Sequence, residues 1–178
     1  EGSNAYLLIA RNGLADLLPD MATPDDLFQE QIKLVWDTKA FMYGRVVNKK
    51  ARHNLCFADY DQKADYENKK GTIINFNTLP NLSYVRTRLG YIIPSVLDGL
   101  QCEGNLYYDV SKTYIGFHGD TERRIVVAVR LGTEFPLYFQ WYLRHKAIGS
   151  LFKTILRNGD VYFMSDKAVG YDWKRSSI

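Results

Sequence analysis

His118 and Asp120 are the residues of this chain whose types and spacing point most directly to chemistry. Only Gly119 separates them, and residues two apart on an extended segment point to the same face. An imidazole and a carboxylate placed in this way can bind the same metal ion. The pair would supply two of the three ligands of a facial histidine/carboxylate iron site.

The sequence around this pair predicts strands. Residues 114–117 indicate a strand that runs into the pair, and the β-branched run 125–131 indicates a buried strand after it. Residues 158–160, Asn-Gly-Asp, are typical of a tight turn, and the strand-like segment 161–164 follows. His145 lies in a polar stretch between two strand-like runs, so we expect it at a hairpin tip and not on a metal ion.

Together these segments resemble the AlkB-like group of the Fe(II)/2-oxoglutarate-dependent dioxygenases, over roughly the C-terminal half of the chain. The matching residues are Asn105 with Tyr107 and the segments 115–122, 126–132 and 159–164. The resemblance implies a mostly β fold with flanking helices, namely a double-stranded β-helix or jelly roll. It also implies that His118 and Asp120 bind Fe(II), and that Asn105 and Tyr107 contact the co-substrate 2-oxoglutarate.

The resemblance further implies an oxidoreductase that uses dioxygen to hydroxylate or demethylate a nucleobase in nucleic acid, DNA or RNA. A base in a duplex would have to leave the stack to reach the metal. In AlkB-like enzymes a basic pair that leads into a strand and a long loop forms a lid that recognises the nucleotide. Arg52, His53 and Asn54 match that place best. An equally strong alternative is that His53 and Asn54 only satisfy backbone groups at a sheet edge.

Glu122 is a further candidate that follows the metal pair. It would support the metal ligands or bind a substrate amino group. The commoner role for such a residue is a surface ion pair with Arg123 or Arg124.

The chain departs from the AlkB-like pattern at the third iron ligand. The family has a second histidine shortly after the Gly-Asp strand, followed by arginines for the co-substrate, but no histidine follows His145 here. Three explanations stay open: the chain stops short of the last strand, Asp172 completes the ligand set, or the site is incomplete and catalysis is lost. We favour truncation, because residues 174–178 resemble the start of a strand. Lys174 is the least suitable ligand, since an ammonium with a pKa of about 10.4 must first lose its proton.

Two other kinds of function therefore compete with a nucleic-acid oxygenase. One is a non-catalytic jelly-roll binding or assembly module with an incomplete iron site. The other is an oxygenase that acts on protein.

Residues 1–178 are expected to form a single domain, in which residues 1–100 give helical support and a substrate lid and residues 101–178 form the jelly-roll core. One helix should begin after Thr23 and end near Thr38. A second should cover residues 82–97, with an interruption near Gly90 or Pro94. Each carries one apolar stripe, so both should pack against the strands formed after residue 100.

Composition is compatible with this interpretation. The 178 residues suit one domain, 46% are hydrophobic, and no apolar stretch approaches the roughly 20 residues of a membrane span. The two cysteines argue against a disulfide framework and favour an intracellular location, cytoplasmic or nuclear. The net charge of +3 is small, but basic residues cluster in the chain. The clusters are Lys49, Lys50, Arg52 and His53; Lys69 and Lys70; Arg86 and Arg88; and Lys174 and Arg175.

Overall fold

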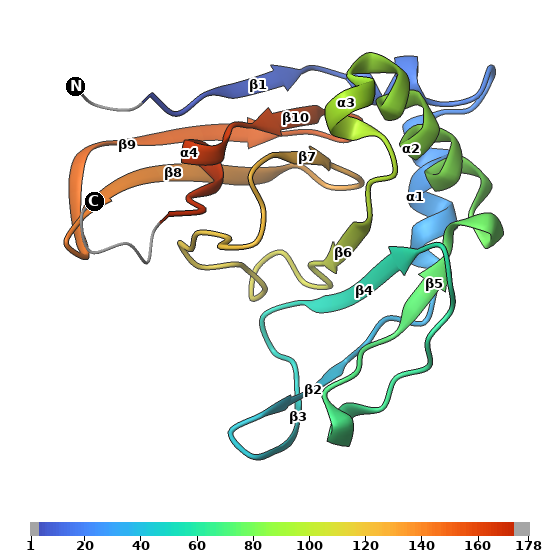
Figure 1. The fold of residues 1–178 in the computed structure, drawn as a ribbon, viewed down its shortest axis with the longest axis horizontal. Helices are drawn as coiled ribbons and strands as arrows, with labels where there is room; N and C mark the ends of the chain where they lie inside the picture. Colours follow the sequence, from blue (N-terminus) through green and yellow to red (C-terminus); the bar gives the residue numbers. More distant parts are fainter. Residues whose placement is uncertain (1–3, 173–178) are drawn as a thin grey trace. The chain divides into compact units, whose positions relative to one another are not determined.

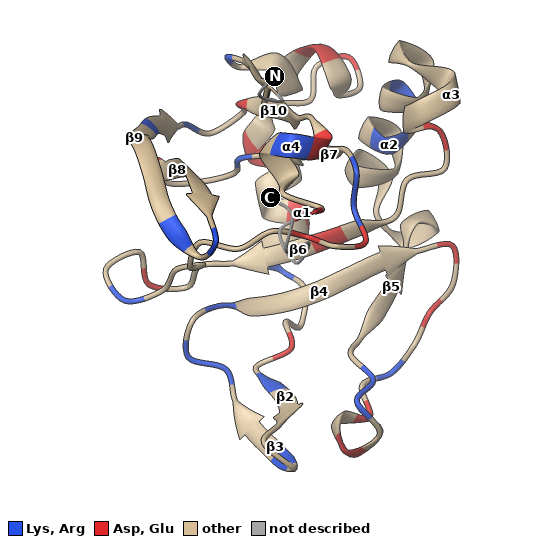
Figure 2. Ribbon diagram, turned by 60° about the vertical axis from the view of Figure 1, so that its left-hand side comes forward, with Lys and Arg blue, Asp and Glu red and all other residues tan. Residues whose placement is uncertain are grey.

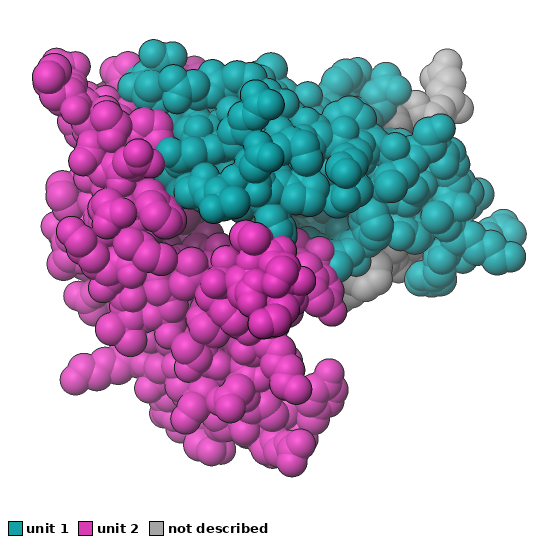
Figure 3. All heavy atoms as spheres, turned by 180° about the vertical axis from the view of Figure 1, so that it is seen from behind, with its two compact units in different colours: residues 1–16, 116–178 teal, residues 17–115 magenta. Residues whose placement is uncertain are grey.

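The structure, a computed structural model, describes residues 4–172 and shows a mostly β fold with four α-helices and several sheets in that part of the chain (Figure 1). The chain divides into two compact units (Figure 3). Unit 1 contains residues 1–16 and 116–178, and unit 2 contains residues 17–115. The metal pair predicted from the sequence lies in unit 1, and the predicted lid lies in unit 2.

Unit 1 contains a three-stranded antiparallel sheet and a separate hairpin. The sheet has the order β1-β10-β7, formed by β1 (Leu7–Ala10), β7 (Val126–Val129) and β10 (Val161–Met164). The hairpin joins β8 (Phe135–Leu143) to β9 (Lys146–Leu156), so His145 lies at its tip as expected. The short helix α4 (Asp166–Val169) follows β10.

The turn before β10 is organised by the buried carboxylate of Asp160, which is 2% exposed. Its oxygens accept hydrogen bonds from the backbone N–H groups of Asn12 and Arg157 and from the guanidinium of Arg11, at 3.1, 2.9 and 2.5 Å. The Asn-Gly-Asp turn and the strand after it are therefore confirmed. A single carboxylate connects the end of β1 to the turn between β9 and β10.

Unit 2 contains three α-helices and two sheets. The helices are α1 (Pro24–Ile32), α2 (Pro80–Ile92) and α3 (Pro94–Leu97), and the 3-10 helices are η2 (Tyr66–Asn68) and η3 (Phe76–Thr78). The 3-10 helix η1 (Gly13–Leu17) lies in unit 1 except for its last residue. The strands β2 (Lys39–Met42) and β3 (Arg45–Asn48) form a hairpin. The second sheet has the order β5-β4-β6, formed by β4 (His53–Ala58), β5 (Ile73–Asn75) and β6 (Cys102–Leu106). Strand β4 is the central strand of that sheet.

The core of unit 2 forms on one face of β4. Leu55 and Phe57 are each 1% exposed and pack with Phe76 and Leu79. Trp36 packs against the same cluster and lies so close to Gly104 of β6 that a Cβ there would be 2.8 Å from the indole. The absence of a side chain at this position thus lets the aromatic ring reach the sheet.

The first predicted helix begins where the sequence indicates but ends earlier. Thr23 and Asp26 form a reciprocal capping box at the start of α1. The helix ends at Ile32 and not near Thr38, so the second half of this prediction is wrong. The helix ends early because Trp36 packs against the hydrophobic cluster on β4. Its indole N–H donates to the carbonyl of Gln31 at 3.1 Å.

The second predicted helix is confirmed as α2 and α3, with the interruption at Ile93. Its packing partner differs from the expectation. Leu82 of α2 packs against the cluster on β4, so the sheet that buries this helix is β5-β4-β6, in which β4 and β5 precede residue 100 and only β6 follows it.

Two strand predictions also need correction. The first 100 residues were expected to be mostly helix and loop, yet they contain β1 to β5, whose short and partly polar sequences hide the strand alternation. Residues 114–117 form no strand, because no neighbouring strand in the described part of the chain pairs with them. The run 125–131 does form β7, but its residues are only half-buried.

None of the described helices is long and apolar enough to cross a membrane.

Replacing Asp160 with Asn should lower the free energy of unfolding by about 2 kcal/mol, because hydrogen bonds that the buried carboxylate accepts from charged and backbone donors are lost or weakened. Burial alone would raise the pKa of Asp160, but the N–H groups of Arg157 and Asn12 and the Arg11 guanidinium outweigh burial and hold it below its usual value. The stabilisation is therefore present above the unfolded pKa of about 3.9 and lost as the pH falls through the lower folded pKa. Urea unfolding at several pH values measures both effects.

The matched control is Asp20→Asn, which removes an exposed carboxylate. It should leave the unfolding midpoint unchanged. Equal stability of the Asp160→Asn protein and the unaltered protein at neutral pH would contradict the role assigned to this turn.

Candidate functional site

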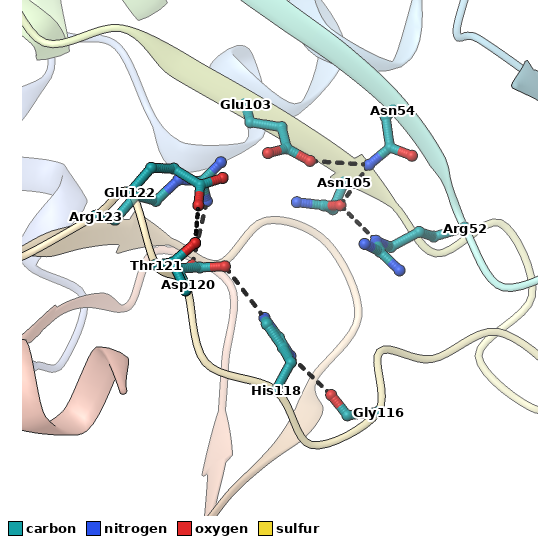
Figure 4. A network of polar contacts seen from close by, with 10 residues as sticks. All are labelled: Arg52, Asn54, Glu103, Asn105, Gly116, His118, Asp120, Thr121, Glu122 and Arg123. Atoms are coloured by element: carbon teal, nitrogen blue, oxygen red, sulfur yellow. Dashed lines mark hydrogen bonds and ion pairs between the residues drawn. The ribbon is translucent and has the colours of Figure 1, made fainter. Parts of the chain in front are cut away.

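The side chains of His118 and Asp120 face each other in unit 1 (Figure 4). His118 Nε2 lies 3.8 Å from Asp120 Oδ1. The histidine side chain is 48% exposed and the aspartate side chain 26%, so a ligand can reach both. The sequence prediction that these two groups point to the same place is confirmed, although their segment is not part of a strand.

A hydrogen bond orients the imidazole. His118 Nδ1 lies 2.7 Å from the carbonyl oxygen of Gly116, and a carbonyl oxygen only accepts, so Nδ1 carries the proton in this bond. In the neutral ring Nε2 is then the atom with the free lone pair. That is the atom that faces Asp120.

The backbone of the pair is held by the segment around α4. The N–H of Asp120 donates to the carbonyl of Val169 at 3.2 Å. Gly170 ends α4 with a φ of 71°, and a Cβ there would lie 3.2 Å from the Cα of Gly119. A glycine at 170 therefore provides both the left-handed turn and the close approach. The guanidinium of Arg123 lies 3.5 Å from Asp120 Oδ2 and leaves Oδ1 directed to the histidine.

The pair has the dimensions of two ligands on one metal ion. Two donor atoms at about 2.1 Å from an ion can be at most about 4.2 Å apart, and about 3.0 Å apart at a right angle. The observed 3.8 Å lies within these limits, and a small side-chain rotation would close it to the right angle. An imidazole nitrogen and a carboxylate oxygen are also a donor set that suits Fe(II).

The described residues contain no group of three or more His, Cys, Asp and Glu side chains that could hold a metal ion. Asp172, the alternative third ligand, is 7% exposed, and its carboxylate makes an ion pair with Lys167. Asp172 is therefore paired with the Lys167 ammonium and is not part of a metal-binding group with His118 and Asp120. The candidate Lys174 and the basic pair that it forms with Arg175 lie outside the described residues.

Glu122 lies next to the pair in the sequence, and its Oε2 accepts a hydrogen bond from the Thr121 hydroxyl at 2.9 Å (Figure 4). The guanidinium of Arg124 lies 5.6 Å from the centre of the Tyr171 ring. Arg123 contacts Asp120. Of these neighbours, Arg123 is therefore the one placed to influence the charge of the metal pair.

A second polar group lies in unit 2, on the neighbouring strands β4 and β6 (Figure 4). Asn105 is directly opposite Asn54 in the strand register. The side-chain oxygen of Asn105 accepts two hydrogen bonds, from Asn54 Nδ2 at 2.6 Å and from Arg52 Nε at 2.7 Å. Asn54 also donates to Glu103 at 3.1 Å. Three of the residues selected from the sequence are thus brought together.

These bonds leave the amide nitrogen of Asn105 available. Its oxygen is occupied by two donors, and no described residue accepts from its Nδ2. An exposed amide N–H₂ held in this way suits a ligand that offers acceptors, such as a carboxylate. Tyr107, the other predicted co-substrate residue, follows β6 and is half-buried.

His53 begins β4 and stacks on Tyr108, with ring centres 4.3 Å apart and planes inclined by 20°. Burial is the main cause that lowers the pKa of His53, and the positive charge of Lys49 lowers it further. The Tyr108 hydroxyl donates to the carbonyl of Lys50 at 2.8 Å, which connects this stack to the basic segment 49–52. The alternative role for Asn54, satisfying backbone groups at a sheet edge, does not fit, because its side chain donates to the side chains of Glu103 and Asn105. For His53 both roles stay predictions.

The loop between β4 and β5, predicted as part of a lid, is attached to the body of unit 2 by Asp37. This carboxylate is 6% exposed and accepts from the Tyr66 hydroxyl, the Thr72 hydroxyl and the Thr72 N–H. Burial and the bond to Asp37 raise the pKa of Tyr66 to about 12. The loop is therefore held at both η2 and the start of β5.

The sequence interpretation missed Gly116, Glu103, Tyr108 and Asp37 as parts of these groups. Glu103 could have been found once β4 and β6 were paired in register, because Asn54 lies opposite Asn105 and Glu103 is two residues from Asn105 on the same face of β6. No local signal identifies Asp37, whose partners lie about 30 residues away in the chain.

No family model matches the chain. Over 175 residues, or 98% of its length, the chain is 46% identical to an uncharacterized protein of Acanthamoeba polyphaga mimivirus. The chain spans 66% of the length of that viral protein.

Replacing Tyr108 with Ala should raise the pKa of His53 towards the ordinary histidine value of about 6.5, because the ring loses the neighbour that covers it. The chain has only three histidines, so NMR titration of the imidazole protons can resolve each one. In the unaltered protein, folding disfavours the protonated form of His53, so this residue reduces stability as the pH falls below about 6.5. The substitution should reduce that pH dependence.

Tyr43→Ala is the matched control, since it removes an exposed tyrosine elsewhere in unit 2. An unchanged His53 pKa in the Tyr108→Ala protein would show that the stack does not cover the imidazole in solution.

Proposed function

We propose that this chain is part of an Fe(II)/2-oxoglutarate-dependent oxygenase of the AlkB-like kind, with a double-stranded β-helix fold, that hydroxylates or demethylates a base in nucleic acid. The observation that carries the proposal is the geometry of His118 and Asp120. An imidazole with its Nδ1 bound to a carbonyl presents Nε2 to a carboxylate oxygen 3.8 Å away. This arrangement matches the role that the resemblance gives to these two residues.

In the proposed site, His118 Nε2 and Asp120 Oδ1 would bind Fe(II). Bound iron together with 2-oxoglutarate and dioxygen would supply an oxidant able to take hydrogen from a C–H bond. The chain itself fixes the direction of the ligands: Gly116 aligns the imidazole, and the backbone of Val169 with Arg123 aligns the carboxylate. Such support of metal ligands by surrounding groups increases metal affinity.

Two features of unit 2 support the remaining roles. The available amide of Asn105 is suited to a carboxylate oxygen of 2-oxoglutarate, as the resemblance implies for Asn105 and Tyr107. Lys49, Lys50 and Arg52 precede β4 and can bind phosphates of a nucleic acid substrate (Figure 2). A neutral His53 stacked on Tyr108 adds an aromatic surface beside these cations.

The second candidate function is a non-catalytic binding module on the same fold. It is favoured by one observation, namely that the described residues offer the metal two ligands and no third. Two side chains would hold iron weakly, so catalysis requires a further ligand. An oxygenase for protein substrates is the third possibility, and it would not need the basic segment.

Conversion of 2-oxoglutarate to succinate should require His118. We expect a version of the protein that continues beyond Ile178 to produce succinate with Fe(II), and more rapidly when a methylated oligonucleotide is added. His118→Ala should reduce turnover at least about 100-fold, because a ligand of the metal is lost. Asp20→Asn should retain full turnover, since this exposed residue lies in unit 2 and in none of the candidate groups.

Wild-type turnover in the His118→Ala protein would remove the metal assignment. Succinate formation that is unaffected by any oligonucleotide would instead indicate a protein or small-molecule substrate. No turnover by the extended protein would favour the binding module.

The third ligand should lie C-terminal to Ile178, on a strand beside the segment that carries His118, with an arginine near it for the 2-oxoglutarate carboxylate. A guanidinium binds a carboxylate in bidentate fashion, which an ammonium cannot do. The extended protein should therefore bind Fe(II) and 2-oxoglutarate at least about tenfold more tightly than the 178-residue chain. Isothermal titration of both proteins measures the difference.

Equal and tight binding by both proteins would place the third ligand within residues 1–178. The Fe(II) affinity of the Asp172→Asn protein would then test whether that carboxylate leaves Lys167 and binds the metal ion.

A further inference from the structure

The hairpin β8–β9 has a composition that differs from the rest of the chain. From Phe135 to Leu156 it contains Arg144, His145, Lys146 and Lys153 but neither Asp nor Glu. Figure 2 shows the same distribution of charge along the two strands. The chain as a whole has almost as many acidic residues as basic ones, 20 against 23. The hairpin is therefore a local concentration of positive charge.

The outer part of this hairpin, residues 141–153, lies at the surface, where the Tyr142 ring contacts Phe117 edge-on at 6.1 Å between ring centres. Every residue from Trp141 to Lys153 is exposed, and the two strands have no other neighbouring strand in the described part of the chain. Trp141, Tyr142, Leu143 and Ile148 are 42–47% exposed. Trp141 and Tyr142 are consecutive strand residues, so their rings project from opposite faces of the ribbon.

A bulge separates the end of the hairpin, residues 141–148, from its base. Phe139 pairs with Phe152, and the next pair is Trp141 with Ile148. Gln140 alone lies between these pairs on β8, whereas Gly149, Ser150 and Leu151 lie between them on β9. The Gln140 side chain donates to the carbonyl of Ile148 at 2.6 Å and closes the irregularity. Bulges of this kind bend a strand and increase its local twist.

The two residues of the turn at the tip carry charged or polar side chains and have a left-handed backbone conformation that favours Asn and Gly. Arg144 and His145 have φ values of 47° and 65°, a conformation for which two-residue hairpins prefer Asn-Gly. Neither Arg144 nor Lys146 makes an ion pair with an acidic residue in the part of the chain that the structure describes. The tip thus presents cations that no described carboxylate neutralises.

We propose that the segment Trp141–Lys153 is a nucleic-acid-binding ribbon, in which Arg144, Lys146 and Lys153 bind phosphates and the ring of Trp141 or Tyr142 stacks on a base. Cations combined with exposed aromatic rings are the features of surfaces that bind single-stranded nucleic acid. The proposal concerns the ligand class of the proposed function but does not depend on iron chemistry.

A membrane surface fits the segment less well. A ribbon that enters a bilayer needs its apolar residues at the leading end, with cations behind them at the interface. Here Arg144 and Lys146 occupy the leading end, so the apolar rings could not enter the bilayer without burying the charges.

The test measures binding of a fluorescent oligothymidylate strand and of a DNA duplex by anisotropy, with a chelator present to exclude metal ions. In one variant, Arg144→Asn and His145→Gly are combined with Lys146→Gln. The Asn-Gly pair suits the turn better than the natural residues, so this variant removes two cations without weakening the hairpin. The slope of log affinity against log salt for the single strand should become shallower by about 1.4, from about 0.7 for each charge.

Trp141→Ala tests stacking and should weaken single-strand binding about tenfold with an unchanged salt slope. The matched control combines Lys33→Gln with Arg88→Gln, which also removes two exposed cations but lies in unit 2. The control should change affinity less than threefold.

Equal losses in the control and in the tip variant would overturn the proposal, because they would indicate a non-specific charge effect. So would undetectable binding to both nucleic acids at low salt, or binding to anionic phosphatidylserine vesicles in place of nucleic acid. Hairpin-dependent binding by a protein that fails to convert 2-oxoglutarate would support the ribbon and refute only the oxygenase.

Discussion

The hydrogen bond between His118 Nδ1 and the carbonyl of Gly116 determines what the imidazole can do. It orients the ring and puts the proton on Nδ1. The unprotonated Nε2, whose lone pair can bind a metal ion, therefore faces Asp120 Oδ1. Without that bond either ring nitrogen could carry the proton, and Nε2 would not be fixed as the atom with the free lone pair. Asp120 is oriented in a similar way. Its N–H donates to the carbonyl of Val169, and the guanidinium of Arg123 lies near Oδ2, so Oδ1 stays directed to the histidine.

The sequence predicted the elements whose signals are local. Thr23 indicated the start of α1, Asn158-Gly159-Asp160 indicated the turn before β10, and His145 was expected at the hairpin tip. It failed where distant residues decide the conformation. Trp36 ends α1 early because it packs on β4, and residues 114–117 stay outside any strand because no described strand pairs with them.

The site shows the same division between local and distant information. The spacing of His118 and Asp120 was sufficient to predict that their side chains meet. The pairing of Asn54 with Asn105 required the register of β4 against β6, which depends on the core formed by Leu55 and Phe57. The roles of Glu103 and Tyr108 follow from that register too, since both contact residues of β4 across the sheet. The polar arrangement in unit 2 therefore depends on which strands the hydrophobic core holds together.

Selective relaxation of histidine signals by Mn(II) tests the central claim, that His118 and Asp120 form a metal-binding pair. Mn(II) is paramagnetic, prefers the same oxygen and nitrogen donors, and broadens the NMR signals of nuclei close to it. His53 and His145, the other two histidines, are not part of the pair and serve as internal references. We predict that substoichiometric Mn(II) broadens the imidazole signals of His118 first, and that Asp120→Asn weakens this effect. Equal broadening of all three histidines, or none at His118, would contradict the assignment.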